Sequence, residues 1–238
     1  LGLAMSLRRD TPTTSDSAVE SVALPNSVEG VVSMAAAIPP RELAEDFEDN
    51  RLGWLTTTGP VSRQVSGGVY QIVITAPNRA IAAYPELGGT YDNLVIQAEA
   101  SLRAGQPESG YGLIFRRQDD DNYYVFAVNG LGQWSIWRLQ DRQWRELRGL
   151  PDGEEWTSAT AILPAGEVNR LKVIAAGANL ALFVNDQLLT PQPIVDEGLR
   201  RGGIGFYAAT SRTSAQATAE LQFDNLLVSR LEALDERP

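Results

Sequence analysis

The chain contains no histidine and no cysteine among its 238 residues. These two absences exclude several kinds of site from this chain: Ser-His-Asp triads, thiol nucleophiles, histidine-ligated zinc, haem held by His or Cys, and cysteine-held iron–sulfur clusters. Carboxylate pairs and oxygen-ligated cations such as calcium remain open. A chain without cysteine fits an oxidising or a reducing compartment equally well, so this absence leaves the localisation open.

Positive charge is also scarce, with 20 Lys+Arg against 30 Asp+Glu and a formal net charge of -10. Nucleic-acid phosphates and anionic lipids are bound by basic surfaces. The charge balance therefore argues against a nucleic-acid partner and against docking on lipid through a basic patch.

Long apolar runs are missing as well, because no stretch approaches the roughly 18 residues that indicate a membrane-spanning helix. The first residues, "LGLAMSLRR", have two interpretations. They are the last part of a signal or anchor segment, or they are a boundary or flexible end.

Residues 1–44 have the composition of an arm or linker. "DTPTTSDSAVESVALPNSVEG" is rich in Ser, Thr and Pro, and a short apolar stretch and a Pro-Pro pair follow. We interpret this segment as a tether. The alternative is an arm that orders against a partner, because four apolar residues would gain from burial: Val31, Val32, Met34 and Ile38.

From Phe47 onward the pattern predicts an all-β domain over residues 45–231, followed by a tail at 232–238. Short apolar runs, several with alternating polarity as in "NLVIQAEASL", are separated by Gly, Asn and Asp turns. Hairpin turns are expected at Gly177-Ala178-Asn179, at Asn185-Asp186 and at Asn129-Gly130. Such a series is typical of an antiparallel sandwich or barrel.

Five strings occur in an order that resembles the concanavalin A-like lectin/glucanase superfamily: "DFEDNRLGW", "YGLIFRRQDDDNYYVFAV", "NRLKVIAAGANLALFVND", "GGIGFYA" and "FDNLLV". The branch they most resemble is the bacterial laminin-G-like and 3-keto-disaccharide-hydrolase-like domains. The resemblance implies a two-sheet antiparallel jelly roll with one concave sheet. It also implies that the first and last strands lie side by side, which would pair the Phe47 region with Phe223 to Val228.

The stretch "FRRQDDDNYY" concentrates charge between two expected strands. Arg116 and Arg117 should leave one strand on opposite faces, so one of them should face a groove or the second sheet. Arg beside Tyr and Trp is a good sugar-binding set, whereas the alternative is a surface ion pair of little energetic value. The aspartates at 119–121 lack the spacing of a calcium loop, so we predict a hairpin turn there.

Four of the five tryptophans, Trp134, Trp137, Trp144 and Trp156, cluster within one part of the chain, close to Tyr123 in sequence. Trp134 and Trp137 are three residues apart and should therefore point to opposite faces of a strand. At most one of them lies in the core if only one face is buried, and the other would be an exposed aromatic contact. The predicted ligand-binding residues are Arg116, Arg117, Tyr123, Trp134 and Trp137.

A calcium ion is a further expectation near the closure of the domain. Asp46, Glu48 and Asp224 fall on the strands that the resemblance pairs, and Asp46 and Asp224 are the candidate ligands. The alternative is that these residues are ordinary cap and turn carboxylates.

The sequence contains no ExDxxE string, through which the glucanases of this superfamily resemble one another and place two carboxylates on one face. We therefore expect a non-catalytic extracytoplasmic recognition domain that binds a glycan or a protein. Its expected setting is a membrane-bound or cell-surface complex that it serves as an accessory subunit. Two alternatives stay open, a carboxylate-dependent glycoside-processing enzyme and a purely structural subunit.

Overall fold

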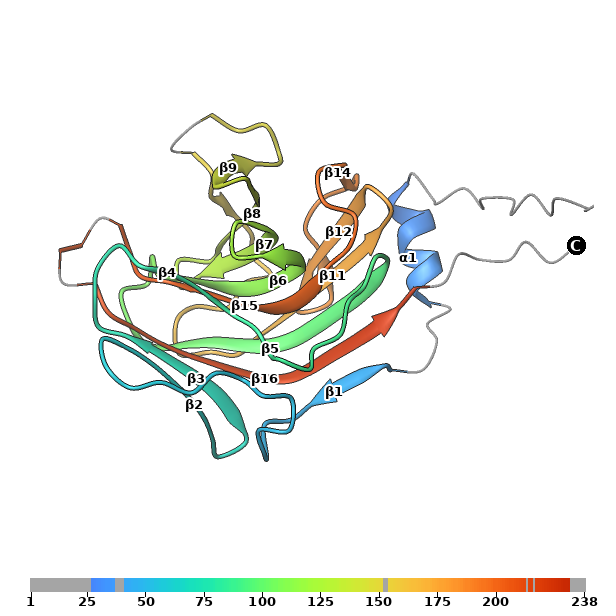
Figure 1. Ribbon diagram of the computed structural model, residues 1–238. Helices are drawn as coiled ribbons and strands as arrows, with labels where there is room; N and C mark the ends of the chain where they lie inside the picture. The colour runs from blue at the N-terminus through green and yellow to red at the C-terminus, as the bar shows by residue number, and fades with distance from the viewer. Residues whose placement is uncertain (1–26, 37–40, 152–153, 213, 216, 232–238) are drawn as a thin grey trace, which may run out of the picture.

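The computed structural model describes residues 27–36, 41–151, 154–212, 214–215 and 217–231. In this part of the chain, two antiparallel sheets lie face to face and one helix packs at the side (Figure 1). The predicted all-β jelly roll is confirmed. No helix in the same part is long and apolar enough to cross a membrane.

The larger sheet has nine strands in the described ranges, with the order β13-β12-β11-β5-β16-β3-β2, while β1 pairs with β16 and β14 with β12. Its strands are β1 Leu43–Glu45, β2 Val61–Ser66, β3 Val69–Ile74, β5 Leu94–Gly105, β11 Asn169–Ala176, β12 Asn179–Val184, β13 Gln187–Leu188, β14 Ile194–Val195 and β16 Ala219–Arg230.

The smaller sheet has seven described strands in the order β10-β8-β7-β6-β15-β4, and β9 pairs with β8. Its strands are β4 Ala80–Ala83, β6 Gly110–Asp119, β7 Asn122–Asn129, β8 Gln133–Gln140, β9 Gln143–Glu146, β10 Thr157–Ser158 and β15 Gly203–Ala209. The hairpins at 119–122, 177–179 and 185–186 lie at the turns that the sequence predicted.

The core lies between the sheets and follows from the alternation of side chains along each strand. Every second residue of β5 from Leu94 to Ala100 is buried in it. Phe223 of β16 and Phe206 of β15 stack with their ring centroids 4.2 Å apart, which joins the two sheets directly. Trp54 stacks on the same Phe206 ring at 4.8 Å. Aromatic pairs of this kind contribute about 0.5–1.5 kcal/mol beyond the area that they bury.

The first strand closes the larger sheet against the last one. Leu43 of β1 pairs with Val228 of β16, and Phe47, just beyond β1, packs 5.5 Å from Trp54. The first and last strands therefore lie side by side, as the resemblance implied. Strand β1 begins at Leu43, so the sheet takes in two residues that the sequence analysis assigned to the arm.

Part of the expected arm is a helix, α1, at Val28–Ala36, which covers one end of the larger sheet (Figure 1). Its first turn is capped by Ser27, whose Oγ accepts a hydrogen bond from the Gly30 N–H. Val31 is fully buried in an apolar cluster with side chains of the outward face of this sheet, including Ile174 and Phe183. Burial of Val31 thus requires no partner, because its own domain provides the surface.

Of the other residues proposed for partner docking, Val32 is half-buried against the same cluster. Met34 belongs to α1. Ile38 lies outside the described residues, so its part in docking stays a prediction.

Replacing Val31 with Ala should lower the free energy of unfolding by about 1–2 kcal/mol, because each buried methylene-sized group contributes about 0.8 kcal/mol. Urea unfolding of the full chain measures this change, and Ser33→Ala on the exposed side of α1 is the control. Equal stability of the two variants would show that α1 does not hold to the sheet in solution.

Candidate functional site

The outward face of the seven-stranded sheet is apolar, although it does not contact the other sheet. Ile114, Val125, Ala127, Leu139 and Tyr207 form a cluster there, separate from the core. An antiparallel sheet that faces water usually alternates apolar and polar residues. A second apolar face therefore indicates a surface built to be covered or to make contacts.

A row of side chains crosses three strands of this face. Tyr123 of β7 lies opposite Leu139 of β8, which lies opposite Trp144 of β9. The Trp144 ring meets the Tyr123 ring edge to face at 5.9 Å, and Trp144 remains 46% exposed. Strand β9 thus presents an exposed indole ring above the sheet.

The next row contains the other outward tryptophans. Val125 lies opposite Trp137, and the Trp156 ring meets the Trp137 ring edge to face at 5.2 Å. Trp156 lies over Gly110, where an added Cβ would come 3.4 Å from the indole, so the glycine leaves room for the ring. Trp137 and Trp156 are both half-buried, and each keeps part of its surface exposed.

Trp134 has the opposite orientation, as its spacing from Trp137 predicted. It is 3% exposed, belongs to the core and packs edge to face with Phe126. The Arg148 guanidinium lies 4.3 Å from its ring centroid. The prediction of Trp134 as a ligand contact is therefore corrected, because the buried ring offers no surface to a ligand.

The two adjacent arginines are separated by a bulge in β6, where the register with β7 shifts after Phe115. Arg116 has a φ of 50° and is fully buried. Its Nε donates to the Asp92 carbonyl at 2.9 Å and its Nη1 to the Leu199 carbonyl at 3.2 Å. Burial lowers its pKa to about 10. Arg116 thus holds two loops together through these hydrogen bonds. Because its side chain is fully buried, the prediction that Arg116 contacts a ligand is corrected.

Arg117 reaches the surface beside Tyr84 and Asp120, a group that we call the Arg117 corner. Its guanidinium carbon lies 3.4 Å from the Tyr84 ring centroid, and its Nη2 donates to Asp120 Oδ1 at 2.7 Å. The Tyr84 hydroxyl donates to the same oxygen at 3.0 Å. The hydrogen bond from Arg117 lowers the pKa of Asp120, and burial raises the pKa of Tyr84. This arrangement holds the guanidinium in one orientation.

Tyr123 connects the Arg117 corner with the tryptophans. Burial raises its pKa to about 12, and the charges of Asp120 and Arg117 also act on it. The candidate ligand residues Arg117, Tyr123 and Trp137 are therefore brought onto one face, while Arg116 and Trp134 are not.

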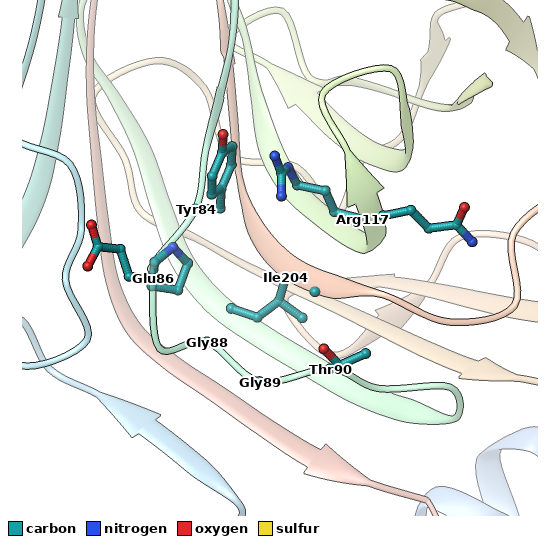
Figure 2. Close-up of a pocket in the computed structure, with 10 residues that line it drawn as sticks. Tyr84, Glu86, Gly88, Gly89, Thr90, Arg117 and Ile204 are labelled. Carbon is teal, nitrogen blue, oxygen red and sulfur yellow. The ribbon is translucent and has the colours of Figure 1, made fainter. Parts of the chain in front are cut away.

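A pocket of about 220 Å³ opens beside the Arg117 corner (Figure 2). Figure 2 shows Tyr84 and Arg117 at one end and Thr90 at the other, with the Glu86 carboxylate directed away from Arg117. The lining residues are Tyr84, Pro85, Glu86, Gly88, Gly89, Thr90, Arg117, Gln118, Gly203 and Ile204. Sequence reasoning missed the segment 84–90. The only sequence signal in this segment was the Gly88-Gly89 pair. A glycine pair indicates a turn but does not indicate which strand lies beside that turn.

Two glycines, one in β15 and one just before it, let the backbone approach its neighbours closely beside this pocket. An added Cβ at Gly205 would lie 2.3 Å from the Ala83 carbonyl oxygen, and one at Gly202 would lie 2.3 Å from the Arg116 carbonyl carbon. At both glycines any side chain would meet backbone, so their lack of one allows the strands to approach closely.

The calcium candidates Asp46 and Asp224 belong to an acidic surface on the larger sheet. Burial raises the pKa of Asp224, and the nearby carboxylates of Glu99, Asp46 and Glu48 raise it further. Within the described ranges, no group of three or more acidic side chains is arranged to hold a metal ion. Calcium at this position stays a prediction.

No protein-family model and no curated protein matches the sequence. Solved structures do match. The carbohydrate binding module CBM66 from Bacillus subtilis is 16% identical, with a TM-score of 0.53 over 74% of this chain and 95% of that chain. A protein of unknown function with a galectin-like fold from Bacillus subtilis is 11% identical, with a TM-score of 0.58 over 81% and 97%.

The GlcNAcα1-4Gal releasing endo-β-galactosidase from Clostridium perfringens is 11% identical, with a TM-score of 0.55 over 82% of this chain and 63% of that chain. At such low identities the likeness concerns the fold. The chain has a two-sheet antiparallel jelly-roll fold, as the resemblance implied, and its place in the concanavalin A-like superfamily stays a prediction. Its assignment to the laminin-G-like branch stays a prediction.

Replacing Asp224 with Asn should stabilise the protein at neutral pH by less than about 1 kcal/mol, since solvent screens partly exposed charges. The folded pKa of Asp224 is raised, so its ionised form costs stability above that pKa, and the cost disappears as the pH falls below the unfolded value. Urea unfolding between pH 3 and 8 measures the difference. The Asn oxygen can still accept the hydrogen bond from the Asn225 N–H. A variant that is less stable at pH 7 than the wild type would contradict this account.

Proposed function

We propose that this protein recognises a glycan on the outward face of the seven-stranded sheet. The observation that supports the proposal is the exposed surface of three tryptophan rings, Trp137, Trp144 and Trp156, on the face that carries the Arg117 corner. Sugars place their C–H faces on aromatic rings and their hydroxyls against fixed polar groups. Aromatic walls with a few oriented polar side chains are typical of small-molecule sites.

The carboxylates of this face favour recognition over catalysis. Asp120 accepts hydrogen bonds from Arg117 and Tyr84, which lower its pKa, so it is a poor general acid. Glu146, opposite Trp137, accepts from Arg148 Nε and from the backbone N–H groups of Arg148 and Leu150. Glycoside hydrolysis requires two carboxyl groups free to exchange protons or to attack, at about 5 Å in retaining enzymes. The carboxylates here are engaged in holding the site.

The comparisons add a class and a setting to this proposal. Structures that share the fold include a carbohydrate binding module and a glycan-releasing enzyme. Glycan binding or processing is therefore the class that we extend to this chain, with binding as the more specific proposal. Since many glycan polymers occur outside cells, we also propose an extracytoplasmic location for the protein. A protein partner and a membrane complex stay predictions from the sequence.

Replacing Trp144 with Ala should weaken glycan binding about ten-fold, which corresponds to a loss of about 1.4 kcal/mol. The indole ring is half exposed, so the fold should tolerate its loss. A glycan array with the full chain identifies a bound glycan, and isothermal titration with that glycan then compares wild type and variant.

Leu131→Ala is the matched control for this experiment. Leu131 is also a large exposed apolar residue, at 52%, but it lies in the turn between β7 and β8. Loss of binding in both variants would point to general stickiness. The proposed function would be refuted if no glycan on an array of broad composition bound the wild-type chain above background.

A further inference from the structure

The pocket beside the Arg117 corner has hydrogen-bond donors for which the described residues provide no acceptor. Arg117 uses Nη2 on Asp120, and its Nη1 has no partner among the described residues. Gly88, Gly89 and Thr90 line the wall, and in the same part of the chain no acceptor faces their backbone N–H groups. The nearby carboxylates are engaged or directed elsewhere: Asp120 accepts hydrogen bonds from Tyr84 and Arg117, and the Glu86 carboxylate points away from Arg117 in Figure 2.

Two charged residues line this pocket, Arg117 and Glu86. Beside the pocket, the Arg117 guanidinium pairs with the Asp120 carboxylate. Glu86 is exposed and lies against Gly53, away from Arg117 in Figure 2, so water screens its charge. The Arg117 guanidinium at the pocket wall can therefore pair with an anionic group of a ligand as well as with Asp120.

The size and position of the pocket limit what it holds. A volume of about 220 Å³ is below the roughly 300–1,000 Å³ of pockets that enclose drug-sized ligands, so it suits one sugar residue. The charge of Arg117 acts on the Tyr123 hydroxyl, and the Tyr123 ring contacts the Trp144 ring. A chain that begins in the pocket therefore meets the aromatic row next.

We propose that this pocket binds a single negatively charged saccharide residue, at the end of a glycan or on a branch, through Arg117 and the 88–90 backbone. The anionic group, a carboxylate or a sulfate ester, pairs with the Arg117 guanidinium. The neighbouring sugars lie across Trp144, whose ring packs against the buried Tyr123 ring. This inference rests on the proposed function and adds the ligand class to it.

The test titrates the full chain with three oligosaccharides of the same length that differ at the terminal residue: a uronate, its methyl ester and a sulfated sugar. The uronate or the sulfated form, or both, should bind at least ten-fold more tightly than the neutral ester. Raising the salt concentration should reduce this preference, because it depends on charge.

Arg117→Gln should remove the preference, so that the uronate and its methyl ester bind this variant with affinities within about two-fold of each other. Arg117→Lys keeps a charge and should keep part of the preference. Arg103→Gln removes the same charge from the other sheet and should change nothing. Urea unfolding of each variant establishes that the fold is intact.

The outcomes separate this inference from the proposed function. Equal binding of charged and neutral forms, with both weakened by Trp144→Ala, would overturn the charged subsite and leave glycan recognition standing. An equal effect of Arg103→Gln and Arg117→Gln would overturn it too, since only the overall field would then matter. If none of the three oligosaccharides bound while a glycan on the array did, the charged subsite would be overturned and glycan recognition would stand.

Discussion

The contact between the two sheets is the constraint on which the rest of this structure depends. Phe206 and Phe223 stack between one strand of each sheet, and Trp54 packs on the same ring. This packing determines which face of every strand turns inward, because side chains alternate along a strand. Once the inward faces are set, Trp137 and Tyr123 must lie outward. A core of this kind therefore decides the orientation of the recognition surface without contributing a residue to it.

The outward face of the smaller sheet is apolar although the core does not need it, and this property supports its role as a recognition surface. Its tryptophan rings cover part of the sheet, and each keeps an exposed part. Trp156 fits because Gly110 has no side chain, and Trp144 is carried there by β9. The same rings thus protect the sheet from water and provide a surface on which a ligand can stack.

The bulge at Arg116 shows how local strain and function are connected. A positive φ at a non-glycine residue costs of order 1–3 kcal/mol, and here buried hydrogen bonds to two carbonyls offset it. The bulge is also where β6 changes register, and the next residue, Arg117, reaches the pocket beside Tyr84. One arginine therefore stabilises the loops, and its neighbour forms the wall of the pocket.

The pairing of the first and last strands was implied by the family resemblance alone. The residue pattern predicted the all-β class, the alternation of the core strands and the opposite orientations of Trp134 and Trp137. These features depend on local periodicity and turn chemistry, which neighbouring residues encode. Packing of distant segments determines which arginine is buried and brings the segment 84–90 beside Arg117. A bulge changes the face of a side chain through one backbone angle, and the pocket joins segments more than a hundred residues apart. Neither is encoded in a pattern of adjacent residues, so packing had to decide both.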